Sequence, residues 1–296
     1  MILKLKGTGV AIVTPFHKYG TIDFNSLKKL IEHLITNNVN YLVVMGTTGE
    51  SVVLSKDEKN ALINFVVEEV DKRVPIVLGI GGNYTQLVKD TILSTNLEGI
   101  DAILSVSPYY NKPQQKGIYL HYKEIAGASP LPIILYNVPG RTNSNISAET
   151  TLEIAKNFDN IIGIKEASGD LNQIMKIIMN KPKGFLVISG DDILTLPIMA
   201  IGGDGVISVT ANAFPKEYSE MVSLCLRRNI KQALELHNKL FDFTNEIFAD
   251  GSPSGIKAAL EILGICSNNL RLPLVKVNKS IQLKLQEHIS KLKKEN

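Results

Sequence analysis

The stretch that decides the fold is Ile161-Ile162-Gly163-Ile164-Lys165. It follows the turn-forming pair Asp159 and Asn160, and its uninterrupted apolar character is typical of a strand buried on both faces of a parallel sheet. The run ends on a lysine. Burial disfavours the charged ammonium, so a lysine at such a strand end can serve as a nucleophilic amine. Alternatively, Lys165 only marks the point where the strand reaches solvent, and the stretch alone leaves both interpretations open.

Seven further runs of the same kind occur along the chain, and each is followed by a longer segment with the apolar spacing of an amphipathic helix. The eight runs are 9–15, 40–45, 75–80, 102–106, 132–136, 161–165, 185–189 and 205–209. This alternation predicts an α/β fold, a closed (β/α)8 TIM barrel over residues 1–229. Residues 230–296 show further helical patterns, and we expect a C-terminal helical extension packed on the barrel within the same domain unit.

An open, doubly wound sheet is the rival architecture. It usually has fewer strands, and its dinucleotide-binding version carries a glycine-rich fingerprint in the first turn between strand and helix. The corresponding turn here is Val13-Thr14-Pro15-Phe16-His17, which has no glycine. The barrel is therefore favoured, and it places the active site at the carboxyl ends of the strands.

The composition is that of an ordinary globular protein, with 44% hydrophobic and 21% charged residues and a formal net charge of +3. The small charge and scattered basic residues argue against nucleic acid or a membrane surface as a partner. No apolar stretch is long enough to span a bilayer, and the N-terminus resembles no leader segment. Cys225, Cys266 and the five histidines show no ligand spacing, so we expect no metal, no cofactor and a cytoplasmic location.

The second predicted strand ends in Gly46-Thr47-Thr48-Gly49-Glu50-Ser51. Two glycines flank two hydroxyl side chains, so free backbone N–H groups and the threonines can converge on an anion such as a carboxylate. In the alternative interpretation, the threonines merely bond their own backbone within a tight turn.

Aromatic residues and an arginine follow the fourth and fifth predicted strands. Tyr109 and Tyr110 stand on a proline-flanked loop, where they suggest a subunit contact or an active-site rim, or else two rings resting on the barrel mouth. Tyr136 ends the fifth strand, and we expect a buried ring whose hydroxyl can pass a proton. Arg141 suits bidentate binding of a substrate carboxylate, unless it forms only a surface ion pair.

With these residues at neighbouring strand ends, the chain resembles the dihydrodipicolinate synthase and N-acetylneuraminate lyase family of class I aldolases. The resemblance covers nearly the whole chain. Its most specific motifs are Gly46-Thr47-Thr48-Gly49-Glu50-Ser51, Tyr136-Asn137-Val138-Pro139 and Gly163-Ile164-Lys165. It implies that Lys165 forms a Schiff base with pyruvate and that no cofactor takes part.

The resemblance also implies a role for each site residue. Those implied to be catalytic are Lys165, Tyr136, Thr47 and Tyr110, and those implied to bind substrate are Thr48, Ile207 and Arg141. Thr47 and Thr48 would hold the pyruvate carboxylate with help from the Ile207 backbone. Thr48 would also link Tyr136 to Tyr110, which would reach into the neighbouring subunit's site in a homotetramer built as a dimer of dimers.

Arg141 distinguishes the substrates within the family. An arginine at this position in the synthase branch contacts the carboxylate of L-aspartate 4-semialdehyde, whereas the lyases and sugar-acid aldolases carry other residues there. The resemblance thus implies condensation of pyruvate with the semialdehyde to 4-hydroxy-tetrahydrodipicolinate, in diaminopimelate and lysine biosynthesis. The alternatives are an N-acetylneuraminate lyase or 2-keto-3-deoxy sugar acid aldolase with the same Schiff base chemistry, and a catalytically silent, ligand-binding barrel.

Ser51, Asn83 and Tyr109 match positions of a possible allosteric site, because lysine-inhibited relatives bind the inhibitor there. Two other positions depart from that pattern. Lys56 stands where those relatives have histidine or tryptophan, and Leu87 stands where they have the glutamate that accepts the inhibitor's ammonium. Since Lys56 repels a cation and Leu87 offers it no acceptor, we predict weak or absent feedback inhibition by lysine.

Overall fold

The computed structural model describes residues 5–294 and contains a closed barrel of eight parallel strands in chain order. The barrel closes because β1 pairs with both β2 and β8. The strands are β1 (Gly7–Ala11), β2 (Tyr41–Val44), β3 (Ile76–Gly79), β4 (Ala102–Val106), β5 (Ile133–Asn137), β6 (Ile161–Glu166), β7 (Leu186–Ser189) and β8 (Gly205–Ser208). The predicted (β/α)8 fold is therefore confirmed; the expectation about a leader segment concerns residues 1–4, which lie outside the described range.

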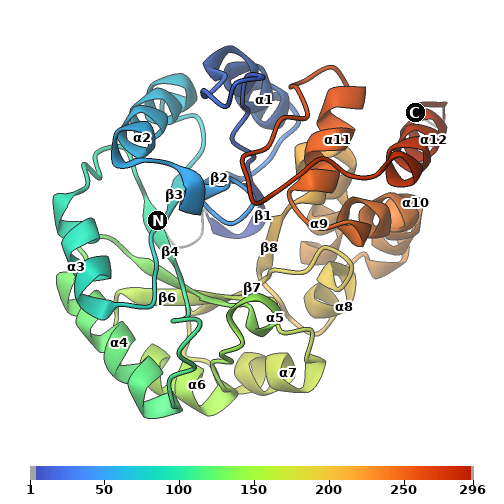
Figure 1. The fold of residues 1–296 in the computed structure, drawn as a ribbon. Helices are drawn as coiled ribbons and strands as arrows, with labels where there is room; N and C mark the ends of the chain where they lie inside the picture. Colours follow the sequence, from blue (N-terminus) through green and yellow to red (C-terminus); the bar gives the residue numbers. More distant parts are fainter. Residues whose placement is uncertain (1–4, 295–296) are drawn as a thin grey trace.

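Helices form a ring around the barrel (Figure 1). They are α1 (Phe24–Thr36), α2 (Lys56–Val70), α3 (Thr85–Ser94), α4 (Gln115–Ala128), α5 (Pro139–Thr142), α6 (Ala148–Asn157), α7 (Leu171–Asn180), α8 (Thr195–Ala200), α9 (Pro215–Leu226), α10 (Ile230–Ala249), α11 (Ser254–Ile262) and α12 (Lys279–Lys294), with the short 3-10 helices η2 (Ser51–Val53) and η3 (Thr210–Asn212). The helices of the ring pack an apolar face on the barrel, because their apolar residues recur with the helical period. In α1, for example, Leu27, Leu30, Ile31 and Leu34 are buried.

The first strand differs from its predicted range of 9–15. Ladder pairing with β8 runs from Gly7 to Val10, pairing with β2 continues to Ala11, and the chain then leaves the sheet. Beyond Ala11 one backbone bond remains, from the Ile12 N–H to the Val43 carbonyl at 3.1 Å, and side chains hold the next residues. The Thr14 hydroxyl donates to the Gly49 carbonyl at 2.7 Å, and Asn212 accepts from the Val13 N–H at 3.3 Å. The apolar residues after Ala11 are thus a buried loop over the barrel end, which a strand pattern cannot distinguish from a strand.

The core has two parts, one inside the barrel and one between the strands and the helices. The inner part includes Tyr136, Ile162 and Ile207, and the outer part includes Ile164. Ile162 and Ile164 face opposite sides because the pairing of β5 with β6 shifts by one residue between Ile133 and Ile134. This bulge reverses the strand's alternation, and it is the reason why the inward position falls on residue 165.

The C-terminal helices pack on one side of the barrel. Helix α10 contacts α8 and α9, and α11 and α12 contact each other and α10. In Figure 1 these helices, drawn in orange and red, lie beside α9 and α1. Within residues 5–294, no helix has the length and apolar character that crossing a membrane requires.

Candidate active site

Lys165 lies at the carboxyl end of β6 with its side chain inside the barrel. Its Nζ lies 4.2 Å from the centroid of the Tyr136 ring, and the two residues are direct partners in the β5–β6 ladder. Only 6% of Lys165 and 7% of Tyr136 is exposed. Among residues 5–294 no carboxylate forms an ion pair with this ammonium. The structure therefore presents a buried amine with an aromatic face as its close neighbour, as the sequence predicted for the Tyr136 ring.

The Lys165 side chain has room because the residue beside it is a glycine. Gly190 follows β7, and a Cβ there would lie 3.0 Å from Lys165 Cε, 3.1 Å from its Cγ and 2.8 Å from the Ala167 Cβ. Those distances are shorter than normal carbon contacts. Any side chain at position 190 would therefore displace the lysine or the strand end.

Ile207 of β8 lies in the same inner core as Tyr136 and is 1% exposed. Just beyond it, the buried Asp192 carboxylate accepts from the Val209 and Thr210 N–H groups at 3.0 and 3.3 Å and from the Ser208 hydroxyl. Burial raises the pKa of Asp192 above its usual value, and the hydrogen bonds from Ser208 and the Val209 N–H offset only part of this rise. Asp192 thus fixes the backbone that follows Ile207.

The Gly46–Ser51 turn follows β2 at the same end of the barrel. Thr47 is exposed, whereas Thr48 and Glu50 are buried. Neither threonine hydroxyl forms a hydrogen bond within residues 5–294, so the interpretation that they merely bond their own backbone is not what the structure shows. Thr47, Thr48 and Ile207 as substrate contacts, and the link from Thr48 to the tyrosines, stay predictions.

A group of residues that we call the C-terminal clamp holds this turn: Phe16, Glu50, Lys257 and Arg271. Lys257 is fully buried, donates to Glu50 Oε1 and to the Asn269 carbonyl at 2.8 Å, and lies 4.2 Å from the Phe16 ring centroid. The Arg271 N–H donates to Glu50 Oε2 at 3.2 Å. Burial lowers the pKa of Lys257, against the opposing effect of the Glu50 carboxylate. Helix α11 and the segment after it therefore support a loop of the candidate site.

Tyr110 does not join the Lys165 group within one chain. It is 87% exposed and has a left-handed backbone with φ of 74°, a strained conformation for a tyrosine. Tyr109 is half-buried. A large ring held out of its own subunit at such a backbone cost is consistent with a contact to another chain, which stays a prediction.

Arg141 lies in the short helix α5, and its side chain is exposed. Within the described residues its guanidinium forms no ion pair, so the interpretation as a surface ion pair is not supported. Its loop begins after Asn137, which is buried and hydrogen-bonded to Glu166 at 3.0 and 3.1 Å. Glu166 faces away from Lys165, toward Gln173 of α7, as the alternation of a strand predicts.

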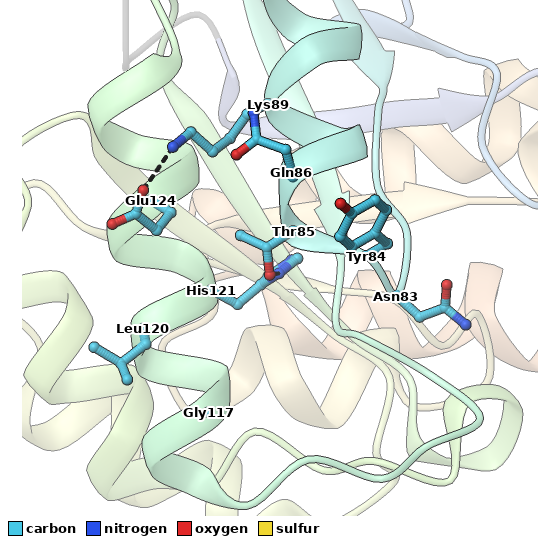
Figure 2. Close-up of a pocket in the computed structure, with 9 residues that line it drawn as sticks. All are labelled: Asn83, Tyr84, Thr85, Gln86, Lys89, Gly117, Leu120, His121 and Glu124. Carbon is cyan, nitrogen blue, oxygen red and sulfur yellow. Dashed lines mark hydrogen bonds and ion pairs between the residues drawn. The ribbon is translucent and has the colours of Figure 1, made fainter.

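A pocket of about 440 Å³ lies between α3 and α4. The ion pair of Lys89 with Glu124, at 2.6 Å, joins the two helices beside it (Figure 2). His121 lies on the floor of the pocket and shares a hydrogen bond with Thr85 at 2.9 Å. Burial lowers the pKa of His121 to about 4, so the ring is neutral at physiological pH.

Of the three possible allosteric residues, Asn83 lines this pocket, but Ser51 and Tyr109 do not. The pocket therefore does not bring the three together within one chain. An allosteric role for them stays a prediction.

Several supporting residues had no signal in the sequence. Lys257 and Glu50 are 207 positions apart, so no local pattern could pair them. Gly190 stands in an ordinary strand-end turn, and its importance depends on where the Lys165 side chain goes. Asn137 stands out in the sequence only as part of a motif, because its partner Glu166 comes from another strand.

Comparison with known proteins places these features in a family. A model of the dihydrodipicolinate synthetase family matches residues 4–292. The 4-hydroxy-tetrahydrodipicolinate synthase of Flavobacterium psychrophilum is 52% identical over 97% of this chain and 98% of its own length. The enzyme of the same name from Parabacteroides distasonis is 50% identical over 98% of both chains. The chloride-inhibited dihydrodipicolinate synthase from Acinetobacter baumannii, solved with pyruvate, has a TM-score of 0.95 at 39% identity and covers 98% of this chain and 99% of that one.

Proposed function

Because the chain belongs to the dihydrodipicolinate synthetase family, we propose that it condenses pyruvate with L-aspartate 4-semialdehyde to 4-hydroxy-tetrahydrodipicolinate. It is an enzyme of diaminopimelate and lysine biosynthesis. Relatives about half identical over nearly their whole length carry this activity in their names. The sugar-acid lyases with the same Schiff base chemistry are not favoured.

One observation carries the assignment of the nucleophile: Lys165 Nζ is buried at a strand end, without an ion-pair partner in the described residues, 4.2 Å from the Tyr136 ring. The Lys165 amine attacks the ketone carbon of pyruvate. Tyr136 passes the proton that the departing hydroxyl needs, and water leaves to form the iminium. Loss of a proton from the pyruvate methyl group then gives the enamine, because the iminium accepts the electron pair.

The enamine carbon attacks the aldehyde carbon of the semialdehyde, whose carboxylate Arg141 binds. The semialdehyde's amino group then displaces Lys165 from the iminium carbon, which closes the ring and returns the free amine. Thr47, Thr48 and the Ile207 backbone hold the pyruvate carboxylate throughout. The threonine hydroxyls, which have no hydrogen-bond partner among residues 5–294, and the exposed guanidinium support these roles.

We also infer a homotetramer built as a dimer of dimers, with Tyr110 reaching the neighbouring site, and a cytoplasmic location. The exposed, left-handed Tyr110 supports the first inference. The buried free thiols of Cys225 and Cys266 agree with a reducing compartment. Light scattering of the purified protein measures the assembly directly.

The function is tested by measuring condensation with the purified chain and its Arg141→Ala variant. We expect turnover of pyruvate with L-aspartate 4-semialdehyde and none with N-acetylneuraminate or 2-keto-3-deoxy sugar acids. The variant should lose at least about 100-fold in kcat/KM for the semialdehyde, since a bidentate, charge-assisted contact is removed. Turnover of a sugar acid by the parent protein would overturn the assignment.

A further inference from the structure

Four polar residues join β5, β6 and α7 outside the barrel, and we call them the amide cluster: Asn137, Asn145, Glu166 and Gln173. The Glu166 carboxylate is its centre. It accepts from the Ser168 N–H at 2.8 Å, from Asn137 Nδ2 at 3.0 and 3.1 Å, and from Gln173 Nε2 at 2.9 Å. The side chain is buried and has no cationic partner among residues 5–294. Three donors thus satisfy a carboxylate that no positive charge neutralises.

The cluster closes the base of the loop that carries Arg141. Asn137 precedes this loop, and its Oδ1 accepts from the Ile146 N–H at 2.9 Å on the far side. Its Nδ2 donates to Asn145 Oδ1 at 2.8 Å as well as to Glu166. One side chain therefore holds both ends of the loop, and Glu166 holds that side chain.

The loop is also held together by hydrogen bonds of its own. The Thr142 hydroxyl lies 3.1 Å from the Val138 carbonyl and 2.9 Å from the Ser144 carbonyl, and the Asn143 N–H donates to the Pro139 carbonyl at 2.8 Å. Outside the amide cluster, the Ser107 hydroxyl lies 3.3 Å from that of Ser144, and Gln115 Nε2 donates to the Asn145 carbonyl at 2.8 Å. The position of Arg141 therefore depends on how the loop is anchored, and Asn137 is the anchor that joins its two ends.

From this arrangement we propose that Glu166 is a positioning residue for Arg141, and so for the aldehyde substrate, acting through Asn137. The inference rests on the proposed function, which gives Arg141 the semialdehyde carboxylate to bind. Lys165 and Glu166 are neighbours in sequence but face opposite sides of β6. Lys165 reacts with pyruvate, and Glu166 supports the binding of the semialdehyde.

Every hydrogen bond in the amide cluster has a fixed direction, so the residue at position 166 must accept from all three donors, and only a carboxylate does so. With an amide at position 166, its N–H₂ would face the donor of Gln173. A flip of Gln173 forces Asn145 to flip, because the two are bonded at 2.8 Å. The flipped Asn145 would then point its donor at the donor of Asn137. Asn137 has no such freedom, since its oxygen is held by the Ile146 N–H.

The test is Glu166→Gln, with both substrates varied. We expect the KM for L-aspartate 4-semialdehyde to rise about tenfold, the equivalent of one lost hydrogen bond to a charged group. The KM for pyruvate and the amount of borohydride-trapped adduct on Lys165 should change less than twofold. The matched control is Glu50→Gln, the same substitution in the C-terminal clamp, which should raise the KM for pyruvate instead.

A charge exchange separates positioning from a general loss of structure. In the Glu166→Gln/Asn137→Asp double variant, a carboxylate still accepts from the Ile146 N–H and the amide at 166 donates to it. We expect this variant to recover the semialdehyde KM to within about threefold of the parent. If Glu166→Gln does not fold, Gln173→Met, which removes one donor, should raise the same KM two- to threefold.

The proposal is overturned if Glu166→Gln leaves the semialdehyde KM unchanged, or if Glu166→Gln and Glu50→Gln affect both substrates alike. It is also overturned if the charge exchange leaves the semialdehyde KM as high as in Glu166→Gln, or if Gln173→Met leaves that KM at the parent value. Failure of the proposed function has a different signature, because then the parent protein itself forms no pyruvate adduct or does not turn over the semialdehyde.

Discussion

Two buried glutamates lie at the same end of the barrel, Glu50 in the turn after β2 and Glu166 at the end of β6. They are stabilised in different ways. Glu50 pairs with the buried ammonium of Lys257 and with the Arg271 N–H. Glu166 is surrounded only by amide donors and a backbone N–H. The first anchors the loop with Thr47 and Thr48, and the second anchors the loop with Arg141. Each of these two loops is thus anchored by a different buried carboxylate.

The difference lies in how far each support reaches along the chain. The partners of Glu166 lie within 29 residues of it, on the strand and helix that adjoin β6. The partners of Glu50 come from the C-terminal region, more than 200 residues away. The loop with Thr47 and Thr48, which we propose binds pyruvate, is therefore supported by the C-terminal region. The loop with Arg141, which we propose binds the aldehyde, is supported by elements of the barrel.

The largest effect is expected for Lys257→Met, which breaks the clamp. It leaves Glu50 as a buried charge without its cation, and loss of one partner of a buried ion pair costs about 3–5 kcal/mol. Denaturant unfolding of the variant measures this change in the free energy of unfolding. In the double variant Glu50→Gln/Lys257→Met no charge is left unpaired, so at least half of the loss should be recovered. A loss below about 1 kcal/mol in the single variant contradicts the role of the clamp.

The second largest effect is expected for Gly190→Ala. This substitution leaves both carboxylates unchanged and crowds Lys165 directly. The new Cβ would lie 3.0 Å from Lys165 Cε and force the amine out of place. We expect kcat to fall about 100-fold, because a displacement near 1 Å can cost that much. Gly127→Ala in α4 is the matched control, since no atom lies within 4 Å of a Cβ there. Steady-state rates of both variants decide the matter, and equal activity would show that Lys165 adapts.

Lowering the pH should change the contributions of Glu58 and Glu166 to the free energy of unfolding in opposite directions. Arg271 hydrogen-bonds Glu58 and lowers the pKa of that carboxyl to about 2, so its contribution to stability is present above pH 4.5 and lost as the pH falls toward 2. Solvent screening limits this contribution to about 1 kcal/mol. Burial raises the pKa of Glu166, so its contribution to stability falls as the pH rises from 4.5 through the raised value.

Unfolding free energies measured between pH 2 and pH 7 test this contrast. Glu58→Gln should flatten the stability profile between pH 4.5 and pH 2. Glu166→Gln should alter the profile only above pH 4.5. Identical profiles for the two variants would mean that the carboxylates do not differ as described.

The smallest effect expected is the response to free lysine. Lys56 and Leu87 are both exposed on α2 and α3, and neither can accept an ammonium. We predict no inhibition of condensation below about 1 mM lysine, which corresponds to weak ligand binding. Leu87→Glu is the informative variant, because a new carboxylate should increase sensitivity. Half-inhibition of the parent below that concentration would contradict the prediction.

The sequence predicted the barrel because each strand is a buried apolar run followed by an amphipathic helix. It also predicted that Lys165 and Tyr136 meet, since carboxyl ends of parallel strands share one edge. It could not reveal the bulge at Ile162 that turns Lys165 inward, because a one-residue shift in pairing leaves no mark in an apolar run. Nor could it pair Glu50 with Lys257, since contacts between distant elements depend on the finished fold.

The central claim is that Lys165 is the amine that forms the Schiff base with pyruvate. The most direct measurement is borohydride reduction of the purified protein with pyruvate, followed by peptide mass mapping. We predict one reduced pyruvate adduct per chain, located on Lys165 and absent from Lys165→Arg. An adduct on another lysine, or none at all in a folded protein, would contradict the account.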